Sequence, residues 1–325
     1  MKARACGSTL RLGVCAVAAM ALVLLLAAPA ADAIKGGQVD AVTQYPWLAQ
    51  VWLDNEFDCG GSLVRAGWIL TAGHCVTERT QSVASKRLTV ILGRQRLDGA
   101  DGEVHRIAAV KLYPSYRLTR DRNHNGFSLG DVALLRLASP SARQAIPLGS
   151  QSESSRWQPG SEVAFLGWGS TAVGGPPSQE LMRGASRVAT QRSCDDAYRP
   201  PEGFDYDASV LLCVAAGNGG QEPCNGDSGG PLLTAAPVPT LVGVDSFGYG
   251  CRQGAIRPTV YARVADNPLR RWLLSVIAPP PPVYLRVAAN GRDVIRPASF
   301  RISARTRFRR MHWRSWSRAG AKGSG

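Results

Sequence analysis

The chain has few of the residues that hold metal ions. It contains four histidines in 325 residues, and no two of its cysteines have the Cys-x-x-Cys spacing. Structural zinc sites draw their ligands from such pairs and from clustered histidines. The composition therefore argues against a zinc protein, and we expect neither a metal nor a cofactor.

A long apolar run and an internal repeat of fixed period are also lacking. The apolar stretch Val14–Ala28 is shorter than the about 20 residues that a membrane-spanning helix needs. It follows a basic start and precedes Ala31-Asp32-Ala33, a small-x-small cleavage pattern. We predict a signal peptide over residues 1–33, so that no transmembrane segment remains. Cleavage after Ala28 or Ala30 would instead leave a short pro-peptide.

Acidic residues are in the minority, with 24 against 38 lysines and arginines, which gives a net charge of +14. Most of this excess lies at the end of the chain. From Val283 onward there are eleven lysines or arginines and one acid, Asp293. The signal segment carries two more net positive charges, so about +2 remains for the residues between them. The basic character is a property of the tail.

The middle of the chain shows many short apolar runs between glycine- or proline-containing turns, which is typical of an all-β protein. A helix is expected to start at Asp266-Asn267-Pro268 and to run to Ile277, with Trp272 on its buried side. The predicted strands are Trp47–Val51, Leu88–Leu92, Val132–Leu137, Val163–Leu166 and Leu241–Val244.

A stiff proline-rich linker over residues 278–282 separates this region from a basic tail over residues 283–325. We expect the tail to be disordered, with strand character only at Val283–Ala288. Arginines and aromatic residues alternate over Arg301–Arg318, a mixture that suits an anionic surface. No nucleic-acid-binding fold fits in so few residues, so no specific nucleic-acid partner is predicted.

Three motifs carry the chemistry. Gly226-Asp227-Ser228-Gly229-Gly230-Pro231 places a serine between glycines, where backbone N–H groups can turn inward. Serine is a weak nucleophile unless a base takes its proton. Thr71-Ala72-Gly73-His74-Cys75 supplies a histidine, and Asp131 precedes the apolar run Val132–Leu137.

The chain order His74, Asp131, Ser228 resembles that of the trypsin/chymotrypsin serine endopeptidases and differs from the orders in subtilisins and α/β-hydrolases. A fourth motif, Ile34-Lys35-Gly36-Gly37, is similar to the mature N-terminus of that family. The resemblance covers residues 34–277. It implies two six-stranded antiparallel β-barrels with a short C-terminal helix.

The resemblance implies a role for each matching residue. Ser228 attacks a peptide carbonyl, His74 acts as base and then acid, and Asp131 orients the imidazole. The N–H groups of Gly226 and Ser228 form the oxyanion hole. The free amine of Ile34 pairs with Asp227, which orders that loop.

Other matches concern substrate binding. Ser246-Phe247-Gly248 resembles the strand that pairs with substrate, and Glu222 stands at the base of the primary pocket, where trypsin-like members have aspartate. A carboxylate there favours cleavage after Arg or Lys. Thr259 narrows the pocket and favours small apolar residues, as in elastase-like members. Alternatively, Glu222 pairs internally with Arg252 or Arg257 and offers no charge to substrate.

Two smaller expectations follow from the resemblance. Lys35 departs from the usual small apolar residue and is expected to point outward. Arg94 stands where calcium-binding members carry an acid, which again predicts no metal. The implied disulfides are Cys59–Cys75, Cys194–Cys213 and Cys224–Cys251.

We therefore predict a secreted, extracellular or periplasmic serine endopeptidase that acts on proteins or peptides through an acyl-enzyme and cleaves after Arg or Lys. The alternatives are the same triad with an elastase-like preference, a catalytically inactive homologue that binds a partner, and an enzyme with esterase activity alone.

Overall fold

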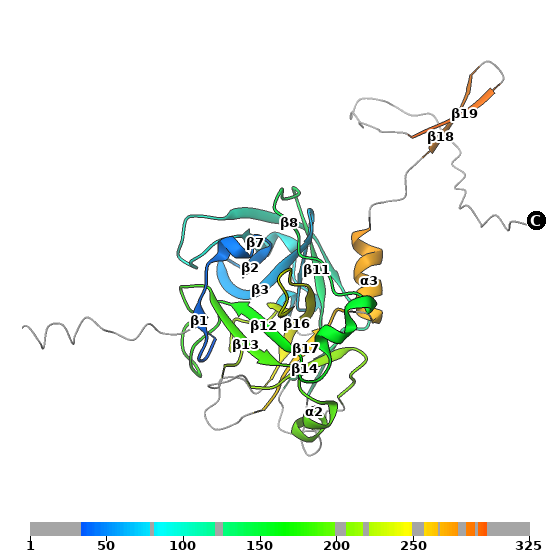
Figure 1. Cartoon of the computed structure of the whole chain (residues 1–325). Helices are drawn as coiled ribbons and strands as arrows, with labels where there is room; N and C mark the ends of the chain where they lie inside the picture. Colours follow the sequence, from blue (N-terminus) through cyan, green and yellow to red (C-terminus); the bar gives the residue numbers. More distant parts are fainter. Residues whose placement is uncertain are drawn as a thin grey trace, which may run out of the picture. The chain divides into compact units, whose positions relative to one another are not determined.

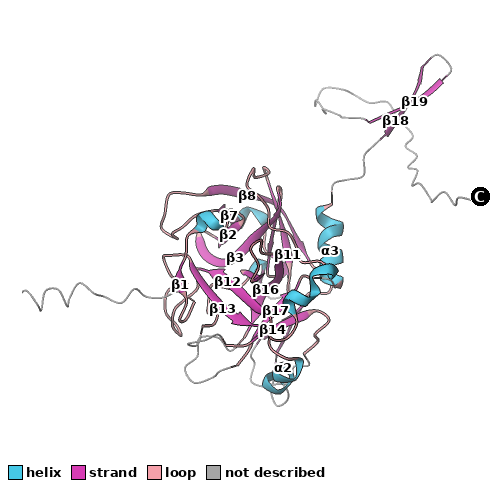
Figure 2. Cartoon of the chain, viewed as in Figure 1, coloured by secondary structure: helices cyan, strands magenta, loops and turns pink. Residues whose placement is uncertain are grey.

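The computed structural model of the chain describes residues 34–78, 81–120, 126–198, 206–216, 221–248, 257–265, 267–278, 284–289 and 292–297. It divides into two units, Met1–Ile277 and Ala278–Gly325. Strands dominate the first unit (Figures 1 and 2). The predicted signal peptide, residues 1–33, and the arginine-rich stretch of the tail lie outside the described residues.

The first half of the first unit is a closed six-stranded antiparallel barrel with the order β11-β4-β3-β2-β7-β8. Its interior is apolar because inward-facing side chains such as Leu63, Val90 and Leu134 are fully buried. The barrel strands are β2 (Leu48–Leu53), β3 (Glu56–Arg65), β4 (Trp68–Thr71), β7 (Leu88–Leu92), β8 (Glu103–Leu112) and β11 (Ala133–Leu137). Two short pairs lie outside it: β5 (Thr77–Glu78) with β6 (Gln81–Ser82), and β9 (Arg117–Arg120) with β10 (Gly126–Leu129).

The second half is a seven-stranded antiparallel sheet with the order β1-β13-β12-β15-β16-β17-β14. Its strands are β1 (Gln38–Val39), β12 (Glu162–Gly167), β13 (Met182–Arg187), β14 (Leu211–Val214), β15 (Pro231–Thr234), β16 (Leu241–Phe247) and β17 (Thr259–Arg263).

This second sheet differs in detail from the six-stranded barrel that the family resemblance implies. Six of its strands curl until the end of β13 meets β14. Among the described residues they meet at the bridge Val188↔Val214, flanked by hydrogen bonds from Ala189 N to Cys213 O at 2.8 Å and from Ala215 N to Arg187 O at 3.0 Å. Strand β1 pairs with the beginning of β13.

Among the described residues, two α-helices accompany the sheets. Helix α3 (Pro268–Ile277) confirms the predicted C-terminal helix, and its buried side chains are Leu269, Leu273 and Ile277. Trp272 is half-buried and packs edge-on against Tyr113, with 5.4 Å between ring centroids. Helix α2 (Gln191–Tyr198) was not expected from the sequence. No helix in the described part of the chain is long and apolar enough to cross a membrane.

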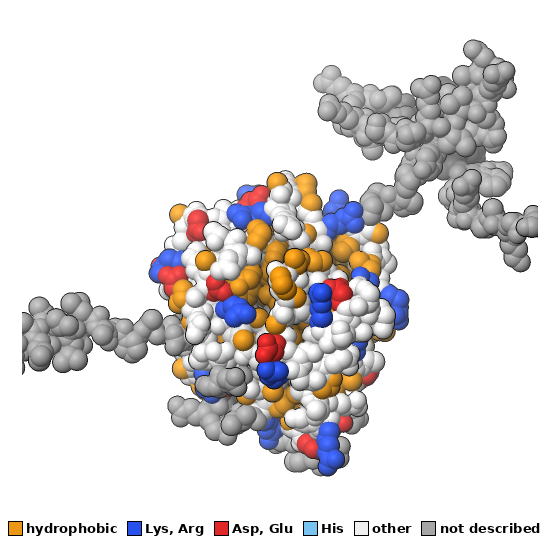
Figure 3. All heavy atoms as spheres, viewed as in Figure 1, with side chains coloured by type: hydrophobic (Ala, Val, Ile, Leu, Met, Phe, Trp, Pro, Cys, Tyr) orange, Lys and Arg blue, Asp and Glu red, His pale blue; other side chains and the backbone are white. Residues whose placement is uncertain are grey.

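The second unit contains one hairpin, β18 (Tyr284–Ala289) with β19 (Arg292–Pro297). These residues lie in the region for which the sequence predicted a disordered tail with strand character at its start. On the first unit, Figure 3 shows basic and acidic side chains interspersed on one face, with apolar side chains gathered across its middle. This mixture agrees with the small net charge deduced for that region.

Candidate active site

His74 and Asp131 are brought together by the pairing of two barrel strands. His74 opens a 3-10 turn, His74–Val76, just after β4, and Asp131 lies just before β11. Strands β4 and β11 pair with Thr71 opposite Ala133. The distance from His74 Nδ1 to Asp131 Oδ2 is 2.8 Å, and His74 N donates to Asp131 Oδ1 at 2.9 Å. The carboxylate therefore fixes both the ring and the backbone of the histidine.

A third contact to this carboxylate comes from the other half of the molecule. Ser246 on β16 donates from Oγ to Asp131 Oδ2 at 2.6 Å, and Asp131 is fully buried. Burial acts to lower the pKa of His74, but the charge of Asp131 and its hydrogen bond outweigh burial, so the pKa of His74 is raised. The imidazole is thus prepared to accept a proton.

Ser228 lies in the loop before β15, next to the turn that carries His74. Gly60 N donates to Ser228 O at 2.8 Å, and Gly229 N donates to Asp245 O at 2.9 Å. Gly229 has φ +76°, and a Cβ added there would lie 2.3 Å from Thr71 Oγ1. Only glycine permits this close approach. Within the described residues no hydrogen bond joins the Ser228 hydroxyl to His74; such bonds often tighten only when substrate is bound.

The backbone around Ser228 leaves two donors unused. Gly226 has φ +96°, a conformation that favours glycine. Asp227 N donates to Cys224 O at 3.0 Å and Gly230 N to Asp227 O at 2.9 Å. Among the described residues, by contrast, no protein acceptor receives the N–H of Gly226 or of Ser228. These are the two donors that the sequence assigned to an oxyanion hole.

Asp227 is buried behind this loop. Its carboxylate accepts hydrogen bonds from Gly169 N at 2.8 Å and Cys224 N at 2.9 Å. A Cβ on Gly167 or Gly169 would lie within 2.4 Å of carboxylate atoms, so both positions require glycine. Burial raises the pKa of Asp227 to about 7, although the two backbone donors oppose the rise.

Ile34 lies against strands β12 and β13, close to Gly167. Its side chain is fully buried and packs with Phe165 and Met182, and Met182 is the strand partner of Gly167. Its φ of +51° is unusual for a β-branched residue. Ile34 therefore packs against the strand partner of Gly167, one of the two glycines that lie against the Asp227 carboxylate.

Glu222, the acid expected at the base of the pocket, pairs with Lys35, a partner that the sequence did not suggest. Lys35 Nζ lies 2.8 Å from Glu222 Oε1, and the two backbones also form a bridge. Lys35 therefore does not simply point outward. Of the arginines considered as partners, Arg252 lies outside the described residues, and Arg257 donates to Ala197 O at 3.3 Å.

The proposed pocket walls come from β16 and β17. Thr259 is 6 % exposed, and a Cβ added to Gly248 would lie 3.6 Å from both Thr259 Cγ2 and Oγ1. The Thr259 side chain thus faces the open side of Gly248. Phe247 packs edge-on against Tyr198 at 5.8 Å between ring centroids, so its ring is held by the α2 helix.

Two disulfides fasten the loops of the site. The bridge Cys59–Cys75 joins β3 to the turn of His74, and Cys194–Cys213 joins α2 to β14. Cys224 is also disulfide-bonded, whereas Cys251 lies outside the described residues.

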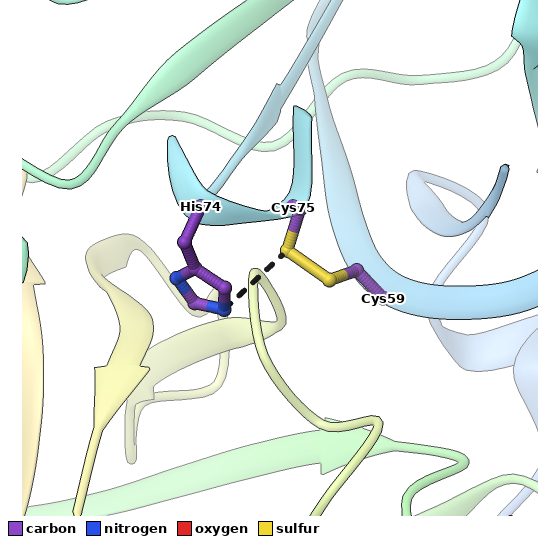
Figure 4. Close-up of side chains that lie close together, drawn as sticks. All are labelled: Cys59, His74 and Cys75. Carbon is purple, nitrogen blue, oxygen red and sulfur yellow. Dashed lines mark hydrogen bonds between the residues drawn. A yellow bond between two sulfur atoms is a disulfide. The ribbon is translucent and has the colours of Figure 1, made fainter. Parts of the chain in front are cut away.

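One group of residues has the spacing of metal ligands within the described part of the chain: Cys59, His74 and Cys75 (Figure 4). Both sulfurs belong to a disulfide, so neither is the thiolate that binds metal. In the loop considered for calcium, Arg94 Nε donates to Asp101 O at 2.8 Å.

The sequence analysis missed two charged residues of this region. Lys35 was not connected with Glu222, because 187 positions separate them and nothing local joins them. Asp245 was overlooked although its signal was visible, since it is the one charged residue in the apolar strand β16.

Comparison with known proteins agrees with this geometry. Residues 34–273 match the family model described as Trypsin. The chain belongs to the trypsin family. As a member of that family it is a serine-type endopeptidase, a hydrolase of peptide bonds.

The relatives of this trypsin-family chain come from organisms that are only distantly related to one another. It is 31 % identical over 232 residues to "Trypsin" of Saccharopolyspora erythraea, covering 71 % of this chain and 93 % of that protein. It is 32 % identical over 253 residues to "Trypsin alpha" of Drosophila erecta, covering 74 % and 86 %. It is 34 % identical over 238 residues to rat "Transmembrane protease serine 9", covering 71 % of this chain but only 21 % of that much longer protein.

Proposed function

We propose that this chain cleaves peptide bonds through an acyl-enzyme formed on Ser228. The observation that carries the proposal is the hydrogen-bonded pair of His74 and Asp131 beside the Ser228 loop. His74 takes the proton of Ser228 and later gives it to the leaving amine. Asp131 holds the imidazole tautomer and stabilises its protonated form.

The two unused N–H groups, of Gly226 and Ser228, receive the oxyanion of the tetrahedral intermediate. Donors that are already in place cost no reorganisation when charge develops on the oxygen. Their freedom from protein acceptors in the described residues supports this role.

The active form begins at Ile34. A free amine there would meet Asp227, whose buried carboxyl otherwise lacks a counter-ion in the described part of the chain. The buried side chain of Ile34 and its unusual φ support cleavage of the peptide bond before it. Once that bond is cut, the backbone torsion φ of Ile34 is no longer constrained. Export with removal of residues 1–33 would supply this terminus. An N-terminal sequence that starts at Ala31 in secreted protein would contradict it.

The substrate is an extended peptide that adds a strand to Ser246-Phe247-Gly248. We propose cleavage after Arg or Lys. The second candidate, cleavage after small apolar residues, is favoured by the position of Thr259 opposite Gly248.

The first experiment is the cleavage profile of the secreted protein on a mixed peptide library, with Ser228→Ala as the matched control. We expect cleavage by the wild type only, with the control reduced by about 10³-fold or more. Cleavage after Ala or Val would favour the second candidate. Labelling by a serine-directed fluorophosphonate without peptide cleavage would indicate an esterase, and absence of both would indicate an inactive homologue.

The tail over residues 283–325 is proposed to bind anionic surfaces through its arginines. Its arginine-rich stretch lies outside the described residues, so the proposal rests on composition. The test is sedimentation with anionic vesicles, compared between the full chain and a chain that ends at Ala278. Equal binding of the two would show that the tail does not contribute.

A further inference from the structure

Four acids are buried in the described part of the chain: Asp131, Glu222, Asp227 and Asp245. Three of them have partners. Asp131 binds His74 and Ser246, Asp227 accepts two backbone N–H groups, and Glu222 pairs with Lys35. A buried carboxylate without such partners is costly, so the exception among the four points to a missing ligand.

Asp245 is that exception. It is 6 % exposed. Its carboxylate has one backbone donor, the N–H of Ser246, against two for Asp227, and no described side chain donates a hydrogen bond to it or forms an ion pair with it. Burial, followed by the neighbouring Asp227, raises the pKa of Asp245 to about 8. The charges of His74 and Asp131 also act on it, so the carboxyl lies close to the catalytic residues.

The strand geometry places Asp245 beside the nucleophile. Its N donates to Gly230 O and its O accepts from Gly229 N, both at 2.9 Å, so it pairs with the two residues that follow Ser228. Successive side chains of a strand point to opposite faces. The Ser246 side chain points to Asp131 beside the first barrel. The Asp245 side chain therefore lies on the opposite face of the second sheet.

A second polar group shares that face without a partner. Tyr261 lies directly opposite Asp245 on β17, is fully buried, and its hydroxyl has no hydrogen-bond partner among the described residues. Burial and then Asp245 raise the pKa of this phenol. A carboxylate and a phenol oxygen together suit a ligand that is rich in N–H donors, and the guanidinium group has five.

The carboxylate of Glu222, at the expected base of the pocket, is already paired with a cation. Glu222 is 4 % exposed and its partner Lys35 is held by the backbone bridge between the same two residues. A cationic side chain of the substrate would therefore meet a neutral pair at this position.

We propose that Asp245, and not Glu222, is the residue that selects Arg or Lys on the amino side of the cleaved bond. The substrate cation pairs with the Asp245 carboxylate from the wall of the pocket beside Ser228. This inference rests on the proposed peptidase function and deepens it.

The test uses the full chain processed to Ile34, with active sites counted by a serine-directed fluorophosphonate. Matched peptide amides differ only in the residue before the cleaved bond: Arg, its neutral isostere citrulline, or Ala. We expect Asp245→Asn to lower the Arg-to-citrulline ratio of kcat/KM by at least ~30-fold, as for loss of a buried charge partner. In a Lys35→Met background, which removes the cation that Glu222→Gln would otherwise leave unpaired, Glu222→Gln should alter that ratio by less than about threefold.

The outcomes separate the two levels of the proposal. A ratio that falls with Glu222→Gln in the Lys35→Met background and not in Asp245→Asn would assign the cation to Glu222 and overturn the inference. So would a wild-type enzyme that cleaves the Ala peptide and treats Arg and citrulline alike, although the peptidase function would stand. A wild type that takes no fluorophosphonate would refute the proposed function itself.

A second measurement does not depend on the folding of Asp245→Asn. Benzamidine, a small amidinium, should slow fluorophosphonate labelling of Lys35→Met and of Lys35→Met with Glu222→Gln, with inhibition constants within about threefold of each other. Loss of this protection in the double variant would also overturn the inference.

Discussion

Ser246 shows how one hydroxyl connects the two halves of the active site. Its Oγ lies on the second sheet, while the Asp131 carboxylate that it contacts belongs to the first barrel. Asp131 has four lone-pair sites and a fully buried position, so each donor contributes to holding it. The orientation of His74 depends in turn on this carboxylate.

At the residue scale we predict that Ser246→Ala lowers kcat/KM by about tenfold or more. The change removes a hydrogen bond to a buried charge, which is worth about 2 kcal/mol. The effect should be milder than that of Asp131→Asn, for which about 10⁴-fold is expected because the imidazole loses its tautomer. Peptide amide kinetics with active-site titration measure both. Unchanged kinetics in Ser246→Ala would show that the hydroxyl is not needed to hold Asp131.

Helix α3 illustrates how a local signal determines an element. Asn267 directly precedes Pro268, and its Oδ1 accepts a hydrogen bond from Arg270 N at 2.9 Å. This is the N-cap arrangement, with proline at the first helical position. Leu269 and Leu273 then lie four residues apart and are buried on one side of the helix.

At the element scale, Asn267→Ala should destabilise the folded protease unit by at least about 1 kcal/mol, because the N-cap acceptor is lost together with the hydrogen bonds that Asn267 Nδ2 donates to Ser209 O and Arg263 O. For a domain of this size the expected decrease in Tm is at least about 2–4 °C. Ser275→Ala on the same helix is the control, since that side chain is exposed and bonds only to Trp272 O. Thermal denaturation of both variants in a Ser228→Ala background avoids self-digestion. Equal Tm values would show that α3 is held by packing alone.

At the scale of the whole molecule, we propose that a free amine at Ile34 and the Asp227 carboxyl are coupled through folding. The carboxyl has a folded pKa of about 7, above its value of about 3.9 in an unfolded chain. An acid whose pKa is raised on folding loses stability as pH rises between these two values. A free amine at Ile34 would remove that loss by pairing with the ionised carboxylate.

We therefore predict that a chain starting at Ile34 and one that retains Ala33 differ little in stability at pH 4 and most near pH 7–8. Above that range the difference should decrease as the amine, whose pKa the pair raises above its usual value of about 7.7–8.0, loses its proton. Denaturation of the two Ser228→Ala chains between pH 4 and 9 measures the effect, and parallel curves would refute the coupling.

The sequence by itself determined the features that depend on neighbouring residues. Leu88–Leu92 was predicted as a strand with the bounds that the structure has, and the helix was predicted to its end at Ile277. The family was identified from short motifs, and the proposed triad rests on the same motifs, because a nucleophile loop needs its glycines next to the serine. Strand Leu241–Val244 was found but ended too early, since Asp245 and Ser246 are polar residues with tertiary roles.

Only the tertiary structure decided the charges of the pocket. The pairing of Lys35 with Glu222, and the lack of a side-chain partner for Asp245 among the described residues, arise from strands that meet across the fold. Hydrophobic periodicity carries no information about such contacts. The contact between β13 and β14 was likewise invisible, because it joins residues that are far apart in the sequence. Local patterns specify elements and nucleophile; the energy of a buried charge depends on which partners the fold brings to it.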